Sequence, residues 1–258
     1  MPEIAEVRIM SDYINHHSDG NTYHSAYHVE KGNIAKKFHK KEFLLESSSN
    51  GKELLVKMGD IPIYCFMGMS GNWKYVPTDK WEDTKHIRLR FDNNDGYSLL
   101  MHGGYMGPKY SVNKKFNGVK RGPDPVKEFD KFKENIISNL ERKHFDKPIC
   151  DVLLDQRYFN GVGNYVRSTV LYYLDINPFL DARETIKNNI DILEMCRDVA
   201  IKAYKLNGGQ LRDWKNPFDS DYKEFRDWVF YQKGISCKDS TGRTFWFDKK
   251  WENKCVYK

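Results

Sequence analysis

The sequence predicts an α+β fold of two domains, on the basis of three observations. A helical pattern opens the chain, short β-prone runs follow to about residue 110, and helical patterns dominate from residue 126 onward. The length of 258 residues is enough for two modest domains, and 40% hydrophobic residues can supply their cores. We therefore expect an N-terminal β-sandwich flanked by helices and a C-terminal helical domain that ends in a β-hairpin.

The first domain is expected over residues 1–111. Apolar residues at positions 4, 7, 10 and 14 form one helical stripe, which predicts a helix over 4–16. Short runs separated by Gly, Asn and Asp then predict strands, because these residues favour turns. The clearest predicted strands are Glu53–Met58, Ile61–Met67, His86–Phe91 and Tyr97–Met101.

The second domain is expected over residues 128–258, after a polar linker over 112–127 that contains Pro and Gly. Periodic apolar residues predict four helices in it, followed by a Gly-rich loop, a further helix near 222–232 and a β-hairpin whose returning strand is Thr244–Phe247. The four helices are expected over 126–141, 148–159, 162–174 and 186–206.

The composition limits the class of protein. The five cysteines are scattered and never form a C-x-x-C pair, which favours a reduced, intracellular protein. No run of 18 apolar residues predicts a membrane span, and the first twenty residues lack the layout of a signal peptide.

The net charge of +6 is concentrated near the C-terminus, where residues 226–258 carry eight Lys/Arg, four Asp/Glu and eight aromatic residues. Cations that meet phosphates and rings that stack on bases suit a nucleic-acid surface. A solvated basic tail over a small aromatic core explains the same composition, so both interpretations stay open on charge alone.

The start Met1-Pro2-Glu3 suggests amine chemistry. Methionine is normally removed before a small second residue, and an α-amine with a pKa of about 8 is partly neutral near pH 7. The secondary amine of Pro2 could attack a sugar C1′ and form an iminium ion, with Glu3 and Glu6 facing the same pocket to move protons. Ordinary helix capping explains the same three residues equally simply.

A second motif is the loop Gly161-Val162-Gly163-Asn164 between two predicted helical segments. Backbone N–H groups at a helix start bind phosphate well, although a lone G-x-G also occurs in simple helix–turn–helix elbows. The longer string 153–167 closely resembles the helix–two-turn–helix signature of the formamidopyrimidine-DNA glycosylase / endonuclease VIII family. Residues 1–7, 51–56 and 66–71 resemble that family's N-terminus, its lysine-bearing strand and its void-filling loop.

The resemblance covers essentially the full chain and is closest to animal endonuclease VIII-like enzymes with a zincless finger, placed here at about 222–250. It implies a bifunctional DNA glycosylase and abasic-site (AP) lyase of base excision repair, which excises mainly oxidised pyrimidines with β,δ-elimination. For the reaction, the resemblance implies roles for four residues. Pro2 is the nucleophile, Glu3 is the general acid/base, Glu6 is a positioning carboxylate, and Lys52 is the lysine that neutralises a phosphate beside the lesion.

For DNA binding the resemblance implies a second set of residues. Asn164 matches the phosphate-binding asparagine, flanked by Gly163 and Tyr165, and Arg243 matches the hairpin arginine. Met69 matches a wedge that fills the gap left by a flipped base. Gln210 lies in the loop that resembles the lesion-recognition loop. Taken singly, these residues have ordinary structural explanations. Lys52 is more typical of a charge on an edge strand and Asn164 of a helix cap. Arg243 is more typical of a surface charge and Met69 of a core side chain.

Several departures and absences complete the expectations. Where the family carries an Arg-Arg-Phe-Gly loop, this chain has Gly104-Tyr105-Met106-Gly107, so weak discrimination of the opposite base is expected. Only Cys237 and Cys255 lie near the finger, too few for a four-ligand zinc, so no metal and no cofactor are expected. The expected partner is damaged double-stranded DNA, with single strands and bubbles left open, bound by a monomer that would act in the nucleus of a eukaryote. A non-catalytic DNA-binding protein and a lyase restricted to abasic sites remain alternatives.

Overall fold

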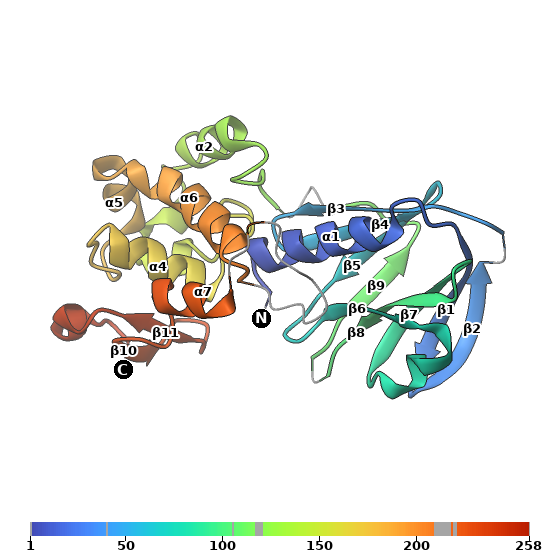
Figure 1. Ribbon diagram of the computed structural model, residues 1–258. Helices are drawn as coiled ribbons and strands as arrows, with labels where there is room; N and C mark the ends of the chain where they lie inside the picture. Colours follow the sequence, from blue (N-terminus) through green and yellow to red (C-terminus); the bar gives the residue numbers. More distant parts are fainter. Residues whose placement is uncertain are drawn as a thin grey trace. The chain divides into compact units, whose positions relative to one another are not determined.

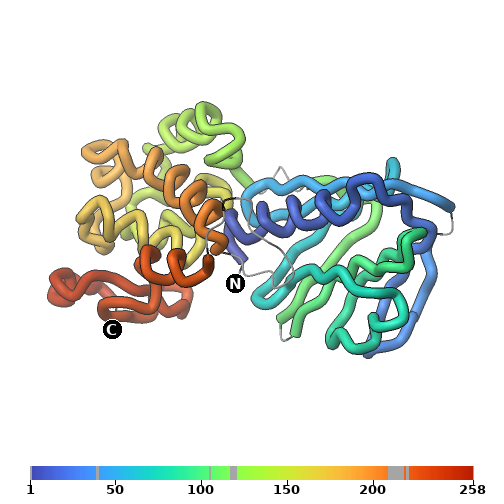
Figure 2. Tube along the Cα trace, in the orientation of Figure 1, coloured from blue at the N-terminus to red at the C-terminus, as the bar shows by residue number. Residues whose placement is uncertain are grey.

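The structure is a computed structural model that describes residues 2–39, 41–104, 106–116, 121–208, 218 and 221–257. The chain divides into two compact units (Figures 1 and 2). Unit 1 comprises Met1–Phe116 with Gly209–Asp219, and unit 2 comprises Asn117–Gly208 with Ser220–Lys258.

Unit 1 is a β-sandwich of two antiparallel sheets, as the sequence predicts. One sheet has the order β2-β1-β7-β8-β6 and the other the order β3-β4-β5-β9. The strand Glu53–Met58 has the predicted bounds, and the other predicted strands differ by one or two residues at their ends. The elements are β1 Tyr23–Glu30, β2 Asn33–His39, β3 Leu45–Asn50, β4 Glu53–Met58, β5 Ile61–Phe66, β6 Asn72–Pro77, the 3₁₀ helix η1 Thr78–Asp83, β7 Ile87–Asn93, β8 Tyr97–His102 and β9 Lys109–Val112.

Helix α1, Ile4–Ser18, packs against this sandwich through its apolar stripe, and Val7 and Ile14 on that stripe are fully buried. Two hydrogen bonds fix α1 to β3: Asn15 Nδ2 donates to the Ser47 carbonyl at 3.0 Å, and Ser47 N donates to Asn15 Oδ1 at 2.6 Å. The Tyr13 hydroxyl accepts from the Tyr75 backbone N on β6 at 2.8 Å. The first residues of the chain are therefore held on a rigid element.

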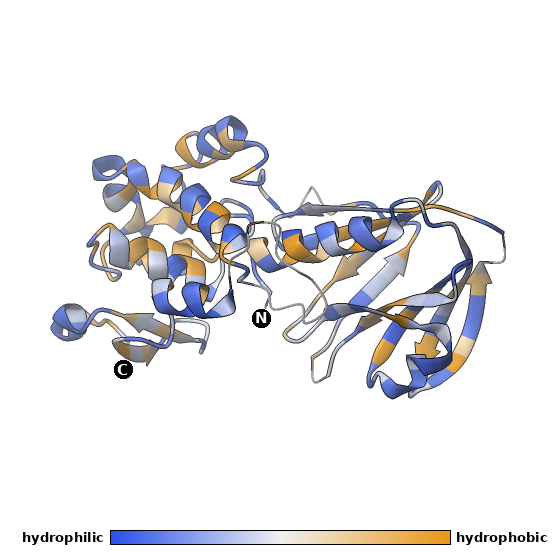
Figure 3. Cartoon of the chain, in the orientation of Figure 1, coloured by the Kyte–Doolittle hydropathy of each residue, from blue (hydrophilic) through white to orange (hydrophobic). Residues whose placement is uncertain are grey.

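Unit 2 is helical and ends in a hairpin. In Figure 3 several of its helices show both apolar and polar residues, as expected of helices with one face on a core. None of the helices in the described part of the chain is long and apolar enough to cross a membrane. The elements are α2 Phe129–Ile137, η2 Lys143–Asp146, α3 Ile149–Val152, α4 Asn164–Tyr173, α5 Ala182–Asn188, α6 Asp191–Lys205, α7 Tyr222–Trp228, β10 Ile235–Lys238, β11 Thr244–Phe247 and η3 Lys249–Lys254.

Two predicted helices of unit 2 are wrong in extent. The helix expected over 148–159 lasts only for the single turn of α3, because the Asp155 side chain accepts from Arg157 N at 2.9 Å and so stabilises a turn in place of a helix. The helix expected over 186–206 is two helices, α5 and α6. It is broken at Asn189, whose backbone leaves the helical region with ψ 68°.

The terminal hairpin β10–β11 is held by aromatic side chains, as expected from its composition. Phe245 and Phe247 on β11 are 0% and 3% exposed. Both rings meet Phe179 edge-on, at centroid distances of 6.4 and 5.0 Å. Apolar packing therefore stabilises this hairpin in the way a domain core does.

Candidate active site and nucleic-acid interface

The start of α1 gathers two buried carboxylates beside Pro2. Glu3 and Glu6 are 3% and 8% exposed, and Pro2 is half-buried. The backbone N–H of Glu3 donates to Glu6 Oε2 at 2.7 Å, and the Glu3 side chain accepts from the backbone of Glu6, which makes a capping box. The capping role that the sequence allowed is therefore real, and it fixes both carboxylates next to residue 2.

Lys52 lies in the turn that joins β3 to β4, where the resemblance implied a strand. Asn50 pairs with Glu53, so Gly51 and Lys52 form a two-residue loop, and Gly51 has the positive φ of 54° that glycine tolerates at such a position. A strand position would point the lysine out of one face of the sheet, whereas a turn presents the half-buried side chain at the end of the sheet.

The register of α1 on β3 brings Lys52 level with Glu3. Figure 1 shows the two elements side by side and running in opposite directions, and Asn15 and Ser47 are bonded to each other. Back from Asn15 to Glu3 the helix rises by about 18 Å. Forward from Ser47 to Lys52 the strand and turn advance by at most about 17 Å. The lysine, Pro2 and the two glutamates therefore lie at one end of unit 1.

Two loops of unit 1 expose methionines side by side. Met69, in the turn after β5, is 43% exposed, and its backbone N–H donates to the carbonyl of Met106, which is 63% exposed, at 2.9 Å. Gly68 allows this approach, because a Cβ at its position would lie 2.2 Å from the Met106 carbonyl oxygen. Met106 stands at the position of the phenylalanine in the family's Arg-Arg-Phe-Gly loop, and the structure places its backbone beside that of Met69.

In unit 2 the side chain of Asn164 does not cap its helix. Gly163 occupies the N-cap of α4 with extended backbone, and Asn164 Nδ2 donates to the Thr244 carbonyl on β11 at 2.6 Å. Tyr165 is 7% exposed and packs edge-on against Phe225, so its ring belongs to the core. At this helix start, Asn164 is the side chain that reaches the hairpin.

A buried ion pair connects α4 to the hairpin, and the sequence did not predict it. Arg167 Nη2 lies 2.7 Å from Asp239 Oδ2, and both side chains are fully buried. The same guanidinium donates to Asn164 Oδ1 at 2.6 and 3.0 Å and lies over the ring of Phe245. An arginine among the apolar residues of 165–171 was the available signal, since a charge on a buried helix face needs a partner.

Asp239 in turn shapes the loop that carries Arg243. Its Oδ1 accepts from Thr241 N, Thr241 Oγ1 and Arg243 N at 2.9, 2.7 and 3.0 Å. Burial raises the pKa of Asp239, but the hydrogen bonds from Thr241, Arg167 and Arg243 outweigh it and leave the pKa below its usual range. Arg243 itself is exposed. One network thus positions an amide and a guanidinium, the groups that bind phosphate.

The remaining predicted residue, Gln210, lies outside the described residues. Within the described ranges no group of three or more His, Cys, Asp or Glu could hold a metal ion. All five cysteines belong to those ranges and are free thiols.

Known proteins with the same features define the class of this chain. Residues 1–103 match the model of the formamidopyrimidine-DNA glycosylase N-terminal domain. Human endonuclease 8-like 1 is 30% identical over 96% of this chain and 72% of its own length, and the mouse protein is 29% identical over the same shares. The chain belongs to the formamidopyrimidine-DNA glycosylase / endonuclease VIII family, a family of DNA glycosylases.

Solved structures support the fold. The MutM (Fpg) protein of Thermus thermophilus matches with a TM-score of 0.74 and 22% identity, covering 97% of this chain and 98% of that one. The Fpg protein of Lactococcus lactis, bound non-covalently to DNA that contains an AP site, matches with a TM-score of 0.77 and 19% identity over 95% of this chain and 97% of that one.

Proposed function

We propose that this chain is a bifunctional DNA glycosylase and AP lyase of base excision repair that uses the amine of Pro2 as its nucleophile. The observation that carries the proposal is the start of α1, where Glu3 and Glu6 are buried and fixed beside Pro2. A helix cap needs neither a residue-2 proline nor two buried acids, whereas amine catalysis needs a nucleophilic amine and a proton carrier close together.

The chemistry follows from these groups. After Met1 is removed, the neutral Pro2 nitrogen attacks the sugar C1′ and the bond from C1′ to the base breaks. The base leaves with the electron pair of that bond and with the proton that the Pro2 nitrogen gives up. Glu3 delivers a proton to O4′ so that the sugar ring opens and an iminium forms. The iminium acidifies the C2′ proton, whose loss expels the 3′ phosphate, and a second elimination expels the 5′ phosphate.

DNA would be held by both units. Lys52 in unit 1 and Asn164 and Arg243 in unit 2 carry the groups suited to phosphates beside the lesion. Met69 and Met106 would fill the space left by the flipped base, since two flexible apolar side chains offset lost stacking. The loop of Met106 lacks the family's arginine, so we expect tolerance of the opposite base and activity on single strands and bubbles. The enzyme would act as a monomer on oxidised pyrimidines, in the nucleus if the host is a eukaryote and otherwise wherever the genome is replicated.

The test is covalent trapping. The protein lacking Met1 is incubated with oligonucleotides that carry thymine glycol or an abasic site, in the presence of borohydride, which reduces an iminium to a stable amine. We expect an adduct on both oligonucleotides, with the DNA attached to the peptide that begins at Pro2 by mass spectrometry.

A matched control carries two extra residues before Pro2 that are not removed, so that its nitrogen is a peptide nitrogen. This control should bind DNA and form no adduct. Trapping of the control at the wild-type level would rule out Pro2. An adduct on the abasic oligonucleotide alone would select a lyase restricted to abasic sites, and DNA binding without any adduct would select a non-catalytic binding protein.

A further inference from the structure

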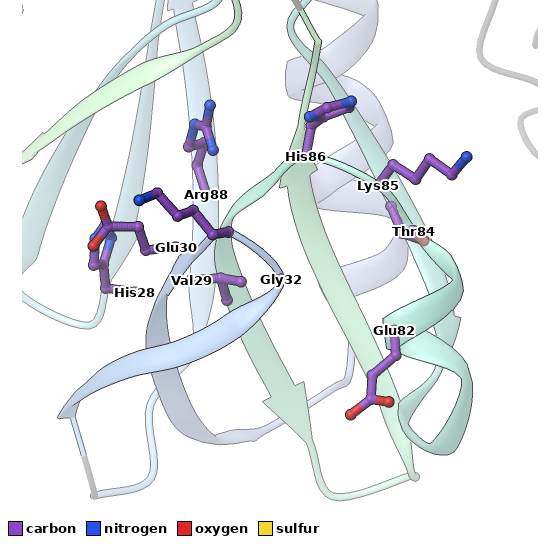
Figure 4. A pocket seen from close by; sticks show the side chains of 10 residues that line it. His28, Val29, Glu30, Gly32, Glu82, Thr84, Lys85, His86 and Arg88 are labelled. Atoms are coloured by element: carbon purple, nitrogen blue, oxygen red, sulfur yellow. The ribbon is translucent and has the colours of Figure 1, made fainter.

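Unit 1 contains a cavity of about 790 Å³ that the residues discussed above do not use. It lies where the β1–β2 turn, the segment after η1 and the start of β7 meet (Figure 4). Five of its lining residues carry nitrogen bases or cations, namely His28, Lys31, Lys85, His86 and Arg88. Glu30 and Glu82 also line it, and Thr84 contributes a hydroxyl.

Arg88 is turned toward this cavity by a β-bulge. In the pairing of β7 with β8, Ile87 faces His102 and Leu89 faces Met101, which leaves Arg88 as the extra residue. Such a residue is unpaired in the ladder, and a bulge redirects its side chain. Arg88 is half-buried, with Ile87 and Leu89 on either side of it fully packed into the sandwich.

The cations of the cavity have no carboxylate partner among the described residues. Lys31, Lys85 and Arg88 take part in no ion pair there, although Glu30 and Glu82 lie on the same rim and are exposed. A half-buried guanidinium that no carboxylate neutralises is a ready site for an anion, and its planar fork matches two phosphate oxygens.

Thr84 supplies a second and independent observation. Its side chain is 8% exposed, and its hydroxyl has no hydrogen-bond partner among the described residues. A buried hydroxyl without a partner is unfavourable, and rotation about χ1 to another staggered position is the motion by which threonine finds one. A phosphate oxygen in the cavity would provide that partner.

The cavity adjoins the loop that carries Met106. The backbone N–H of Gly103 donates to the carbonyl of His86, which lines the cavity, at 3.2 Å. Met106, three residues beyond Gly103 in the chain, accepts at its carbonyl from the Met69 backbone N–H, so backbone hydrogen bonds join this part of unit 1 to both the cavity rim and the turn of Met69.

We propose that this cavity is a phosphate-binding site in which Arg88, Lys85 and Thr84 hold a phosphate of the DNA backbone. The identification of DNA as the source of the phosphate rests on the proposed function. The ability of the cavity to bind a phosphate group does not depend on that function. A free phosphate or mononucleotide presents the same oxygens, so the experiment separates the two sources.

The experiment compares Arg88→Met, Lys85→Gln and Thr84→Val with Lys57→Gln, which removes an exposed lysine of β4 that does not line the cavity. Affinity for an undamaged duplex is measured against salt concentration. We expect Arg88→Met and Lys85→Gln each to reduce the slope of log K against log salt by at most about 0.9, because both cations hold the same single phosphate. Thr84→Val keeps the shape and the charge of the site, so it should lower the affinity for DNA and leave the salt slope unchanged. Lys57→Gln should leave both the affinity and the salt slope as in the wild type.

A second measurement titrates the protein with inorganic phosphate and with dAMP, followed by NMR. Saturable binding of inorganic phosphate or dAMP that Arg88→Met abolishes, with an unchanged DNA salt slope, would overturn the DNA source in favour of a free anion. Variants with wild-type slopes and no phosphate binding by any protein would overturn the site itself. Borohydride trapping at saturating abasic DNA should stay at the wild-type level in all four variants. If the wild-type protein itself forms no adduct, that result counts against the proposed function and not against this site. Thr84→Val and Lys85→Gln keep the test valid if Arg88→Met fails to fold.

Discussion

At the scale of single residues, Glu3 combines a capping role with a proposed catalytic role, and substitution can separate the two. Its carboxylate caps α1, and in the proposed mechanism the same group delivers a proton to the sugar. Glutamine keeps the oxygen that accepts a hydrogen bond in a capping box but cannot deliver a proton. The two functions therefore make different demands on the same side chain.

We predict that Glu3→Gln lowers the rate of base excision by about 10²- to 10⁴-fold, the range of general acid–base catalysis. Abasic-site cleavage should fall less, since that substrate has no base to remove. Single-turnover kinetics on thymine-glycol and abasic oligonucleotides measure both rates, and thermal unfolding checks that the cap survives. An equal loss of stability and of both activities would show that Glu3 is only a cap.

Arg167 is the residue whose removal should affect unit 2 most. Methionine fills a similar volume but leaves Asp239 buried without its cation, and breaking one partner of a buried ion pair costs about 3–5 kcal/mol. We predict that Arg167→Met lowers the free energy of unfolding by that amount in urea titrations. It should also weaken DNA binding, because Asn164 and the loop of Arg243 lose their common anchor.

The double variant Arg167→Met/Asp239→Asn separates the role of Arg167 in positioning the DNA-binding groups from its role in stabilising unit 2. It removes the stranded charge, so it should recover part of the stability lost in Arg167→Met while DNA binding stays weak. If DNA binding recovered together with stability, Arg167 would be a stabilising residue without a positioning role.

The two halves of the site differ in how far the sequence reveals them. Pro2, Glu3 and Glu6 lie within one helical turn, so spacing alone brings them together. Arg167 and Asp239 are 72 residues apart and meet only because the hairpin folds back on α4. No local pattern encodes such a contact, and for that reason it could not be predicted.

At the scale of elements, hydrophobic patterning located α1 and β4 and failed where side chains compete with the backbone. Helix α1 and strand β4 lie where their patterns indicate. The helix expected over 148–159 ends early at Asp155, and the helix over 186–206 breaks at Asn189. Asp and Asn bond to nearby backbone groups, an interaction that hydrophobic periodicity does not register.

The terminal hairpin should be sensitive to acid through Asp239. The pKa of this carboxyl is lowered in the folded state, so its ionised form contributes stability that is present above the unfolded pKa of about 3.9 and is lost as the pH falls through the folded value. We predict that the wild type loses stability steeply below about pH 4, whereas Asp239→Asn is less stable at neutral pH and loses less on acidification.

Unfolding in urea between pH 3 and pH 7 measures this difference, with the fluorescence of Trp246 on β11 as a local probe. Other carboxylates of unit 2 titrate in both proteins, so the difference between the two curves isolates Asp239. Parallel curves over this range would contradict the assignment.

At the scale of the whole molecule, the groups that we propose to bind phosphate are divided between the two units. Lys52 lies on a turn of unit 1, while Asn164 and Arg243 belong to the network of unit 2. Each unit has its own core, so either could bind DNA alone. A repair enzyme of the proposed kind needs both on the same duplex, because the nucleophile is in unit 1 and the hairpin in unit 2.

The salt dependence of DNA affinity can decide whether one unit or both units contact the duplex. Each phosphate neutralised by a cation adds about 0.9 to the magnitude of the slope of log K against log salt on duplex DNA. We predict that Lys52→Ala and Arg243→Ala each lower the slope by about that amount and that the double variant lowers it by about twice as much. Additivity is expected because the two cations belong to separate units. If one single variant keeps the wild-type slope and the double variant equals the other, only one unit contacts the DNA, and the proposal that a lesion is held by both units is wrong.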